Sequence, residues 1–120
     1  MVLVVGALFA SACDSGPSGP GTLNARVEGP PTLGAAVIEV TGGGIQGFED
    51  QGDTRVYGAM VSEVENRYRV VVISPEGGTI RFGIRVDDVG ADLPSASVVT
   101  TASTDNLPAL GTGVSVKIER

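Results

Sequence analysis

The sequence predicts an all-β domain, a two-layer antiparallel β-sandwich of about seven strands, with a small barrel as the alternative architecture. Segments of alternating apolar and polar residues recur along the chain, and Gly, Pro, Asn and Asp separate them. No long segment has the 3.6-residue period of an amphipathic helix. Apolar residues are mainly aliphatic, with two Tyr, three Phe and no Trp. Such a composition favours pleated sheet. At 120 residues, the chain is long enough for one core.

The first element is an uncharged apolar stretch over residues 2–12, which ends in small residues directly before Cys13. That order is typical of the apolar and cleavage regions of a secretory signal peptide. The stretch is about half of the ~20 residues that a membrane-spanning helix needs, so we expect a cleaved signal. No Lys or Arg precedes it, whereas signal peptides begin with a positively charged region, so we expect the true start site to lie upstream.

The run Phe9-Ala10-Ser11-Ala12-Cys13 resembles the lipobox of bacterial lipoproteins. In that family, small residues precede a cysteine that receives lipid before the signal is cleaved. The resemblance implies that Cys13 is the lipid attachment residue and the mature N-terminus. Cys13 is also the only cysteine, so an internal disulfide is excluded. An ordinary cleaved signal and a buried free cysteine are the alternatives.

Residues 14–22, with the sequence DSGPSGPGT, have the composition of a flexible tether. We therefore expect a signal peptide over residues 1–12, a lipidated cysteine and tether over 13–22, and one β-sandwich domain over 23–120. This organisation predicts an extracytoplasmic protein of the cell envelope, attached to a membrane through the lipid on Cys13.

Within the domain, the clearest strand is residues 80–86, where apolar residues alternate with Arg81, Gly83 and Arg85. Such a strand is buried on one side. Two nearly continuous apolar runs, at 35–40 and 70–73, are typical of central strands, covered on both sides or flanked by neighbours. In chain order, we expect strands at 23–27, 35–40, 55–62, 70–73, 80–86, 97–101 and 114–119. Turns are expected at 29–31, 42–44, 65–66, 75–78, 90–94 and 105–106.

Three segments together loosely resemble cohesin-like and other immunoglobulin-like sandwich domains of bacterial surface proteins. They read GAAVIEVTG, RVVVISPEGGTIRFGIRV and VSVKIE, and they span most of the domain. The resemblance implies an immunoglobulin-like or cohesin-like sandwich.

Composition argues against several function classes. The chain has no histidine, and its single cysteine is assigned to lipid, which removes the usual base and the best nucleophile. The only lysine, Lys117, is expected on a solvated strand face. The net charge of −6 comes without a basic cluster, so we expect no nucleic-acid partner. We expect no enzymatic activity and no cofactor.

Two pairs of acidic residues could in principle serve a glycosidase, which needs a general acid and a nucleophile or base at fixed separation. All four residues lie beside expected turns, where acidic residues are common. We interpret them as ordinary turn residues, so a glycosidase is the weakest of the hypotheses about function. The pairs are Glu63 with Glu65 and Asp87 with Asp88.

Two acidic clusters could hold calcium, which prefers six to eight oxygen ligands. Neither has the spacing of an EF-hand loop, so we expect solvated acidic turns and no metal site. The clusters are Glu49, Asp50 and Asp53, and Asp87, Asp88 and Asp92.

Gly42, Gly44 and Gly47 satisfy the G-x-G-x-x-G string of dinucleotide-binding loops, which requires a helix next. Residues 48–53 follow instead, and they are acidic and read as a turn. We therefore interpret the three glycines as loop residues that permit positive φ.

Tyr57 and Tyr68 offer little stacking surface for a sugar, and we expect both to pack in the core or at its rim. The sequence thus predicts a non-catalytic, membrane-anchored interaction or structural module with a protein partner. The alternative is a carbohydrate-binding or calcium-dependent binding domain.

Overall fold

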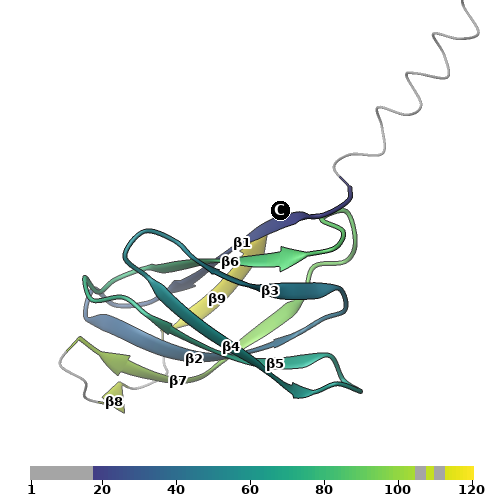
Figure 1. The fold of residues 1–120 in the computed structure, drawn as a ribbon. Helices are drawn as coiled ribbons and strands as arrows, with labels where there is room; N and C mark the ends of the chain where they lie inside the picture. The colour runs from purple at the N-terminus through teal and green to yellow at the C-terminus, as the bar shows by residue number, and fades with distance from the viewer. Residues whose placement is uncertain (1–17, 105–107, 110–112) are drawn as a thin grey trace, which may run out of the picture.

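The computed structural model describes residues 18–104, 108–109 and 113–120, and in them every regular element is a β-strand. The strands form two antiparallel sheets packed face to face (Figure 1). This arrangement confirms the predicted all-β, two-layer antiparallel sandwich. The nine strands are β1 (Gly21–Glu28), β2 (Leu33–Thr41), β3 (Ile45–Asp50), β4 (Arg55–Ser62), β5 (Arg67–Ile73), β6 (Ile80–Val86), β7 (Ser95–Ser103), β8 (Pro108–Ala109) and β9 (Ser115–Glu119).

The four-stranded sheet has the order β3-β6-β1-β9. The five-stranded sheet has the order β4-β5-β2-β7-β8. As expected, β2 and β5 are flanked by neighbours on both edges. Strands β3 and β4 therefore lie at the edges of different sheets on the same side of the sandwich, where a short loop joins them (Figure 1).

The core lies between the sheets, because every second residue of each strand points inward. Strand β6 illustrates this, since Ile80, Phe82 and Ile84 are fully buried while Arg81 and Arg85 are exposed. Burial of such apolar surface is the main favourable contribution to folding, at about 25 cal/mol per Å². The core consists of Leu23, Ala25, Val27, Leu33, Ala36, Ile38, Val40, Ile45, Val70, Val72, Ile80, Phe82, Ile84 and Val86.

All seven predicted strands are present, but the prediction missed β3 and β8. The prediction that residues 48–53 form a turn is correct for residues 51–53 but wrong for residues 48–50, because β3 continues to Asp50. A register shift between Ile45 and Gly47 makes Gln46 an extra residue, and this β-bulge hides the alternation of the strand. Strand β8 is only two residues long. The predicted turn at 105–106 lies outside the described residues.

Both ends of the described domain meet the loop between β6 and β7. The Gly19 amide donates to Asp88 Oδ1 at 3.0 Å, and the Val89 amide donates to the Gly19 carbonyl at 2.9 Å. At the other end, Arg120 Nε donates to the Val89 carbonyl at 2.9 Å. Next to these bonds, Gly21 pairs with Val86 of β6, so β1 begins two residues before the expected start.

Candidate binding surface

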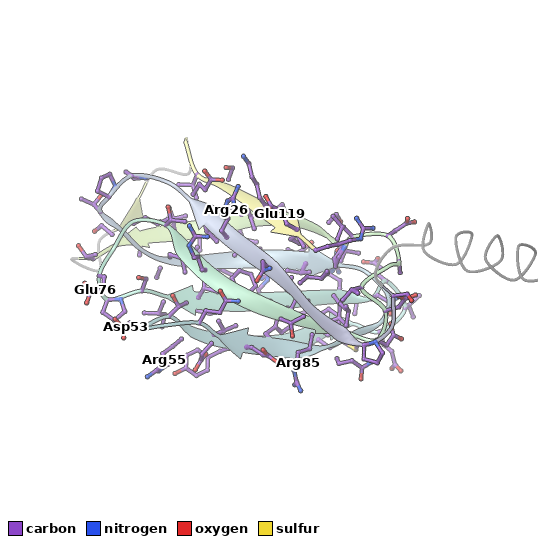
Figure 2. All side chains as sticks on the ribbon, turned by 90° about the horizontal axis from the view of Figure 1, so that it is seen from above. Arg26, Asp53, Arg55, Glu76, Arg85 and Glu119 are labelled. Carbon is purple, nitrogen blue, oxygen red and sulfur yellow. The ribbon has the colours of Figure 1, made fainter. Side chains whose placement is uncertain are left out.

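The outer face of the four-stranded sheet is polar. Arg26 Nε lies 3.0 Å from Glu28 Oε1, and Arg26 Nη2 lies 3.3 Å from Glu119 Oε1. Lys117 Nζ approaches Glu28 Oε1 at 3.5 Å from the neighbouring strand β9. The hydrogen bond from Arg26, together with the charge of Lys117, lowers the pKa of Glu28. Figure 2 shows Arg26 and Glu119 on this face.

The outer face of the five-stranded sheet is apolar over half of its length. Cross-strand pairing aligns Val37 of β2 with Val71 of β5, and Val71 with Tyr57 of β4. The next row aligns Ala102, Ala35 and Ile73, and it ends at Arg55 on the edge strand β4. Alternation turns all of these side chains away from the core. We define the outer apolar face as Ala35, Val37, Tyr57, Val71, Ile73, Thr100 and Ala102.

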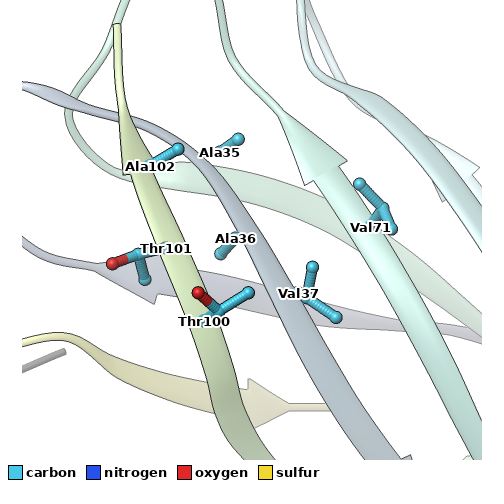
Figure 3. A pocket seen from close by; sticks show the side chains of 7 residues that line it. All are labelled: Ala35, Ala36, Val37, Val71, Thr100, Thr101 and Ala102. Carbon is cyan, nitrogen blue, oxygen red and sulfur yellow. The ribbon is translucent and has the colours of Figure 1, made fainter. Parts of the chain in front are cut away.

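A shallow groove of about 280 Å³ lies within the outer apolar face (Figure 3). Ala35 and Ala102 are paired across β2 and β7, and their small side chains leave this space. The lining residues are Ala35, Ala36, Val37, Val71, Thr100, Thr101 and Ala102.

Charged residues border this apolar half. Glu39 follows Val37 on the outward side of β2, and Arg69 Nη2 lies 3.1 Å from Glu39 Oε2. Arg67 Nη1 lies 3.8 Å from Glu39 Oε1 and 3.1 Å from Glu65 Oε2. An apolar surface with a polar rim is typical of a protein-binding site.

The outer apolar face lies at the end of the sandwich remote from the start of the described chain. Strand β1 starts at Gly21, which pairs with Val86 beside the β6–β7 loop, and runs to the opposite end. Strand β2 begins at that opposite end, and β5 and β7 finish there. The chain therefore enters the domain at one end, and the apolar half occupies the other.

Of the predicted site residues, Cys13 lies outside the described residues. Asp50 Oδ1 accepts the Val56 amide at 2.8 Å, and Asp50 Oδ2 lies 3.6 Å from Arg55 Nη1. Glu49 pairs with Arg85 at 3.4 Å. Among the described residues, no three His, Cys, Asp or Glu side chains come together as a group that could hold a metal ion.

The loop acid Asp88 has a structural role. Its Oδ1 accepts the amide of Gly90 at 2.9 Å as well as that of Gly19. These two backbone hydrogen bonds favour the charged form and lower the pKa of Asp88. The carboxylate thereby ties the entry of the chain to the β6–β7 loop.

Glu63 and Glu65, the pair considered for a glycosidase, lie in the β4–β5 turn. Glu65 Oε2 is bound by Arg67, and the Glu65 amide donates to Ser62 Oγ at 3.3 Å. The Asn66 amide donates to the Glu63 carbonyl at 3.3 Å, which closes the turn. The carboxylates thus lie at a tight surface turn.

Gly42, Gly44 and Gly47 were predicted to be loop residues with positive φ. This prediction is correct only for Gly44, which has a φ of 76°. It is wrong for the other two, which adopt ordinary negative φ because other constraints apply there. A Cβ at Gly42 would lie 2.9 Å from Pro94 Cβ, and a side chain on Gly47, within β3, would overlap Arg85. A strand follows the string, so the helix that a dinucleotide site needs is not formed.

The two tyrosines have different environments. Tyr68 packs edge-to-face against Phe48 with ring centroids 5.7 Å apart, and its hydroxyl donates to the Ile45 carbonyl at 3.4 Å. The prediction of core-rim packing is confirmed for Tyr68. It is wrong for Tyr57, which is 62% exposed because its position on β4 faces outward at the sheet edge.

The outer apolar face was not predicted from the sequence. The signal was present in the apolar runs 35–40 and 70–73, which contain Val37 and Val71 on the side opposite the core. No described element covers that side of the five-stranded sheet.

No family model, no curated protein and no solved structure matches the chain. The part of the chain that the structure describes contains no helix long and apolar enough to cross a membrane. Function is therefore inferred from the residues and geometry of the described domain.

Proposed function

We propose that the protein is a non-catalytic, lipid-anchored module of the cell envelope whose outer apolar face binds a protein partner. The observation that carries this proposal is the apolar surface on one sheet, set against an entirely polar surface on the other. An immunoglobulin-like or cohesin-like module of a bacterial surface protein fits such a role.

The outer apolar face supports binding on physical grounds. Val71 and Ile73 lie on the outer surface of the sheet, and the alanines beside them leave a shallow groove that a partner side chain can fill. Contact with a partner would remove this apolar surface from water, which is favourable. The neighbouring Glu39 and Arg69 supply a charged rim that orients the partner.

The chemistry of the described acids supports a non-catalytic role. Asp50, Glu65 and Asp88 each accept a hydrogen bond or ion pair from a nearby group of the fold. The full sequence has no histidine to act as a general base at neutral pH.

The position of the outer apolar face supports an anchored arrangement. The described chain enters at the β6–β7 end, and Cys13 precedes that entry by a few residues in the sequence. A lipid on Cys13 would hold this end toward the membrane. The outer apolar face would then lie at the end of the domain far from the membrane, where a partner can reach it.

The anchor is tested by the chemistry of the mature N-terminus. We expect mass spectrometry of the native protein to find Cys13 as the first residue, carrying lipid, and a fatty-acid label to enter the wild type. The Cys13→Ser variant should take up no label, while Ser15→Ala, in the tether, should label normally. A mature chain that begins elsewhere without lipid would contradict the anchor.

The binding surface is tested by site-specific photo-crosslinking in intact cells. A crosslinker at Val71, on the outer apolar face, should give one reproducible protein adduct. The same crosslinker at Asn24, outward on the four-stranded sheet, should give none. Equal adducts at the two positions would contradict a specific surface, and turnover of a substrate by the purified protein would contradict the non-catalytic role.

A further inference from the structure

Strand β4 is an exposed sheet edge of unusual character. It pairs with β5 on one side, and no described strand pairs with its other side. Its sequence RVYGAMVS contains no Lys or Pro, the residues that commonly protect an edge. Exposed apolar side chains also gather on it and on the turn that follows, namely Tyr57, Met60, Val61 and Val64, of which Val64 is 95% exposed. Such an edge favours pairing with another strand.

The main-chain groups on the open edge can be assigned. The Val56 amide donates to the Asp50 carboxylate, so the amide of Val56 faces away from β5. Main-chain groups alternate in direction along a strand, so Gly58 and Met60 present their N–H and C=O groups to the same open edge. The Asp50 carboxylate therefore occupies one end of the edge and leaves Gly58 and Met60 accessible.

We propose that a second copy of this chain pairs with β4 in antiparallel orientation, with a two-fold axis through Ala59. Gly58 then lies opposite Met60 of the second copy, and each pair exchanges two hydrogen bonds, four in total. This register leaves the Val56 amide with Asp50. A register centred on Gly58 would need the Val56 amide for a hydrogen bond to the second copy, but that amide already donates to Asp50. The register centred on Ala59 uses only the free main-chain groups of Gly58 and Met60.

The side chains are self-complementary in this register. Tyr57 lies opposite Val61, an aromatic and β-branched pair. Ala59 faces Ala59 of the second copy at a non-hydrogen-bonded position, where side chains approach closely and a small residue fits.

The inner side of the edge has room for the incoming methionine. A groove of about 280 Å³ lies between β3 and β4, and its lining includes Phe48, Gly58, Met60 and Tyr68. Gly58 has no side chain there because a Cβ would overlap the Phe48 ring. Met60 of the second copy, opposite Gly58, would enter this space and place its sulfur beside the aromatic rings, a favourable contact.

This self-association goes beyond the proposed function and does not depend on the lipid, because it uses only β3, β4 and the turn after β4. A single pair of strands makes a small interface, so we expect a dissociation constant of roughly 10–100 µM.

A disulfide across the axis tests the register. In the full chain carrying Cys13→Ser, an added cysteine is the only thiol. Opposed residues at a non-hydrogen-bonded position have Cα atoms about 4.5 Å apart, within the range of a disulfide. Ala59→Cys should therefore form a disulfide-linked dimer under mild oxidation. Ser97→Cys is the matched control, because Ser97 lies in the same cross-strand row, Ala59–Arg69–Glu39–Ser97, but on β7.

Two valines provide a second test in reduced protein. Val61 and Val99 are 49% and 48% exposed, and each is the extra residue of a register shift in the same sheet. Sedimentation velocity should show that Val61→Lys weakens dimerisation at least about tenfold, because the added charge opposes edge pairing, while Val99→Lys has no effect.

Equal oxidation of Ala59→Cys and Ser97→Cys, or equal effects of the two valine substitutions, would overturn the proposal. A full chain that stays monomeric at millimolar concentration would overturn it too. These results are independent of the lipid and photo-crosslinking experiments, so this inference and the proposed function can fail separately.

Discussion

The two sheets bury similar apolar inner faces, but the outer face of one is polar and that of the other is partly apolar. On the four-stranded sheet, outward positions carry charged or polar side chains or glycine, and Arg26, Glu28, Lys117 and Glu119 form a connected set of ion pairs. On the five-stranded sheet, the outward positions near the start of β2 are apolar. Strand alternation alone therefore does not determine what the outer face of a sheet is for.

The difference identifies which face is suited to solvent and which to a partner. The ion pairs of the four-stranded sheet are exposed and contribute little to stability, but they keep that face hydrated. Val37 and Val71 contribute little to the core because they point away from it. In the proposed function, a protein partner would give these side chains the apolar contact that the fold itself does not provide.

The largest effect is expected on the free energy of unfolding, from substitutions on the inner and outer sides of β5. Val72 is fully buried, and its neighbour Val71 points outward on β5. Val72→Ala should lower the free energy of unfolding by about 2–3 kcal/mol, because it removes buried methyl groups and leaves a cavity. Val71→Ala should lower it by less than about 1 kcal/mol. Urea denaturation measures both, and equal losses would show that the outer apolar face belongs to the core.

The next effect concerns binding. Val37→Lys introduces a charge into the groove of the outer apolar face, so the yield of the partner adduct at Val71 should fall about tenfold or more. Asn24→Lys makes the same replacement on the outer face of the four-stranded sheet and should leave the yield unchanged. Circular dichroism should show both variants folded. Loss of the adduct in both would point to a general charge effect.

A smaller, pH-dependent effect is expected at the end where the chain enters. The hydrogen bonds from Gly90 and Gly19 lower the pKa of Asp88 in the folded protein below its value of about 4 in the unfolded chain. Its carboxylate therefore stabilises the fold above that unfolded value, and the contribution is lost as the pH falls through the folded pKa. Thermal melts of Asp88→Asn should lie below wild type at pH 7 and converge with it near pH 2. A constant difference across this range would contradict the assignment.

The smallest effect is expected from the polar face. Glu28 accepts from Arg26 and lies near Lys117, and all three are solvent-accessible. Glu28→Gln should lower the melting temperature slightly at low salt, and the difference should vanish near about 1 M salt, where exposed charges are screened. A large decrease that persists in high salt would mean that this ion-pair set organises the sheet.

Much of the fold could be predicted because its signals are local. The alternation in residues 80–86 and 114–119 predicted β6 and β9, with β9 beginning at Ser115 and Val114 packing against the core just before it. Strand β3 was missed because its bulge at Gln46 breaks that alternation.

The candidate surfaces could not be predicted because they depend on pairing between distant segments. The outer apolar face forms only when residues 35–37, 71–73 and 100–102 come into register. A slip of one residue would turn each set toward the core. The open edge of β4 likewise follows from its place in the sheet order. Lipidation of Cys13, by contrast, rests on a local motif and stays a prediction.

Covalent footprinting tests whether the outer apolar face of the five-stranded sheet is the surface that binds a partner. The full chain is labelled with a carbene probe in its native membranes and after purification, and labelling is compared residue by residue. We predict that labelling of Val37, Val71 and Ile73 falls in the native membranes while labelling of Arg26 and Lys117 is unchanged. Equal labelling of the outer apolar face in both preparations, or protection of the four-stranded face instead, would contradict the account.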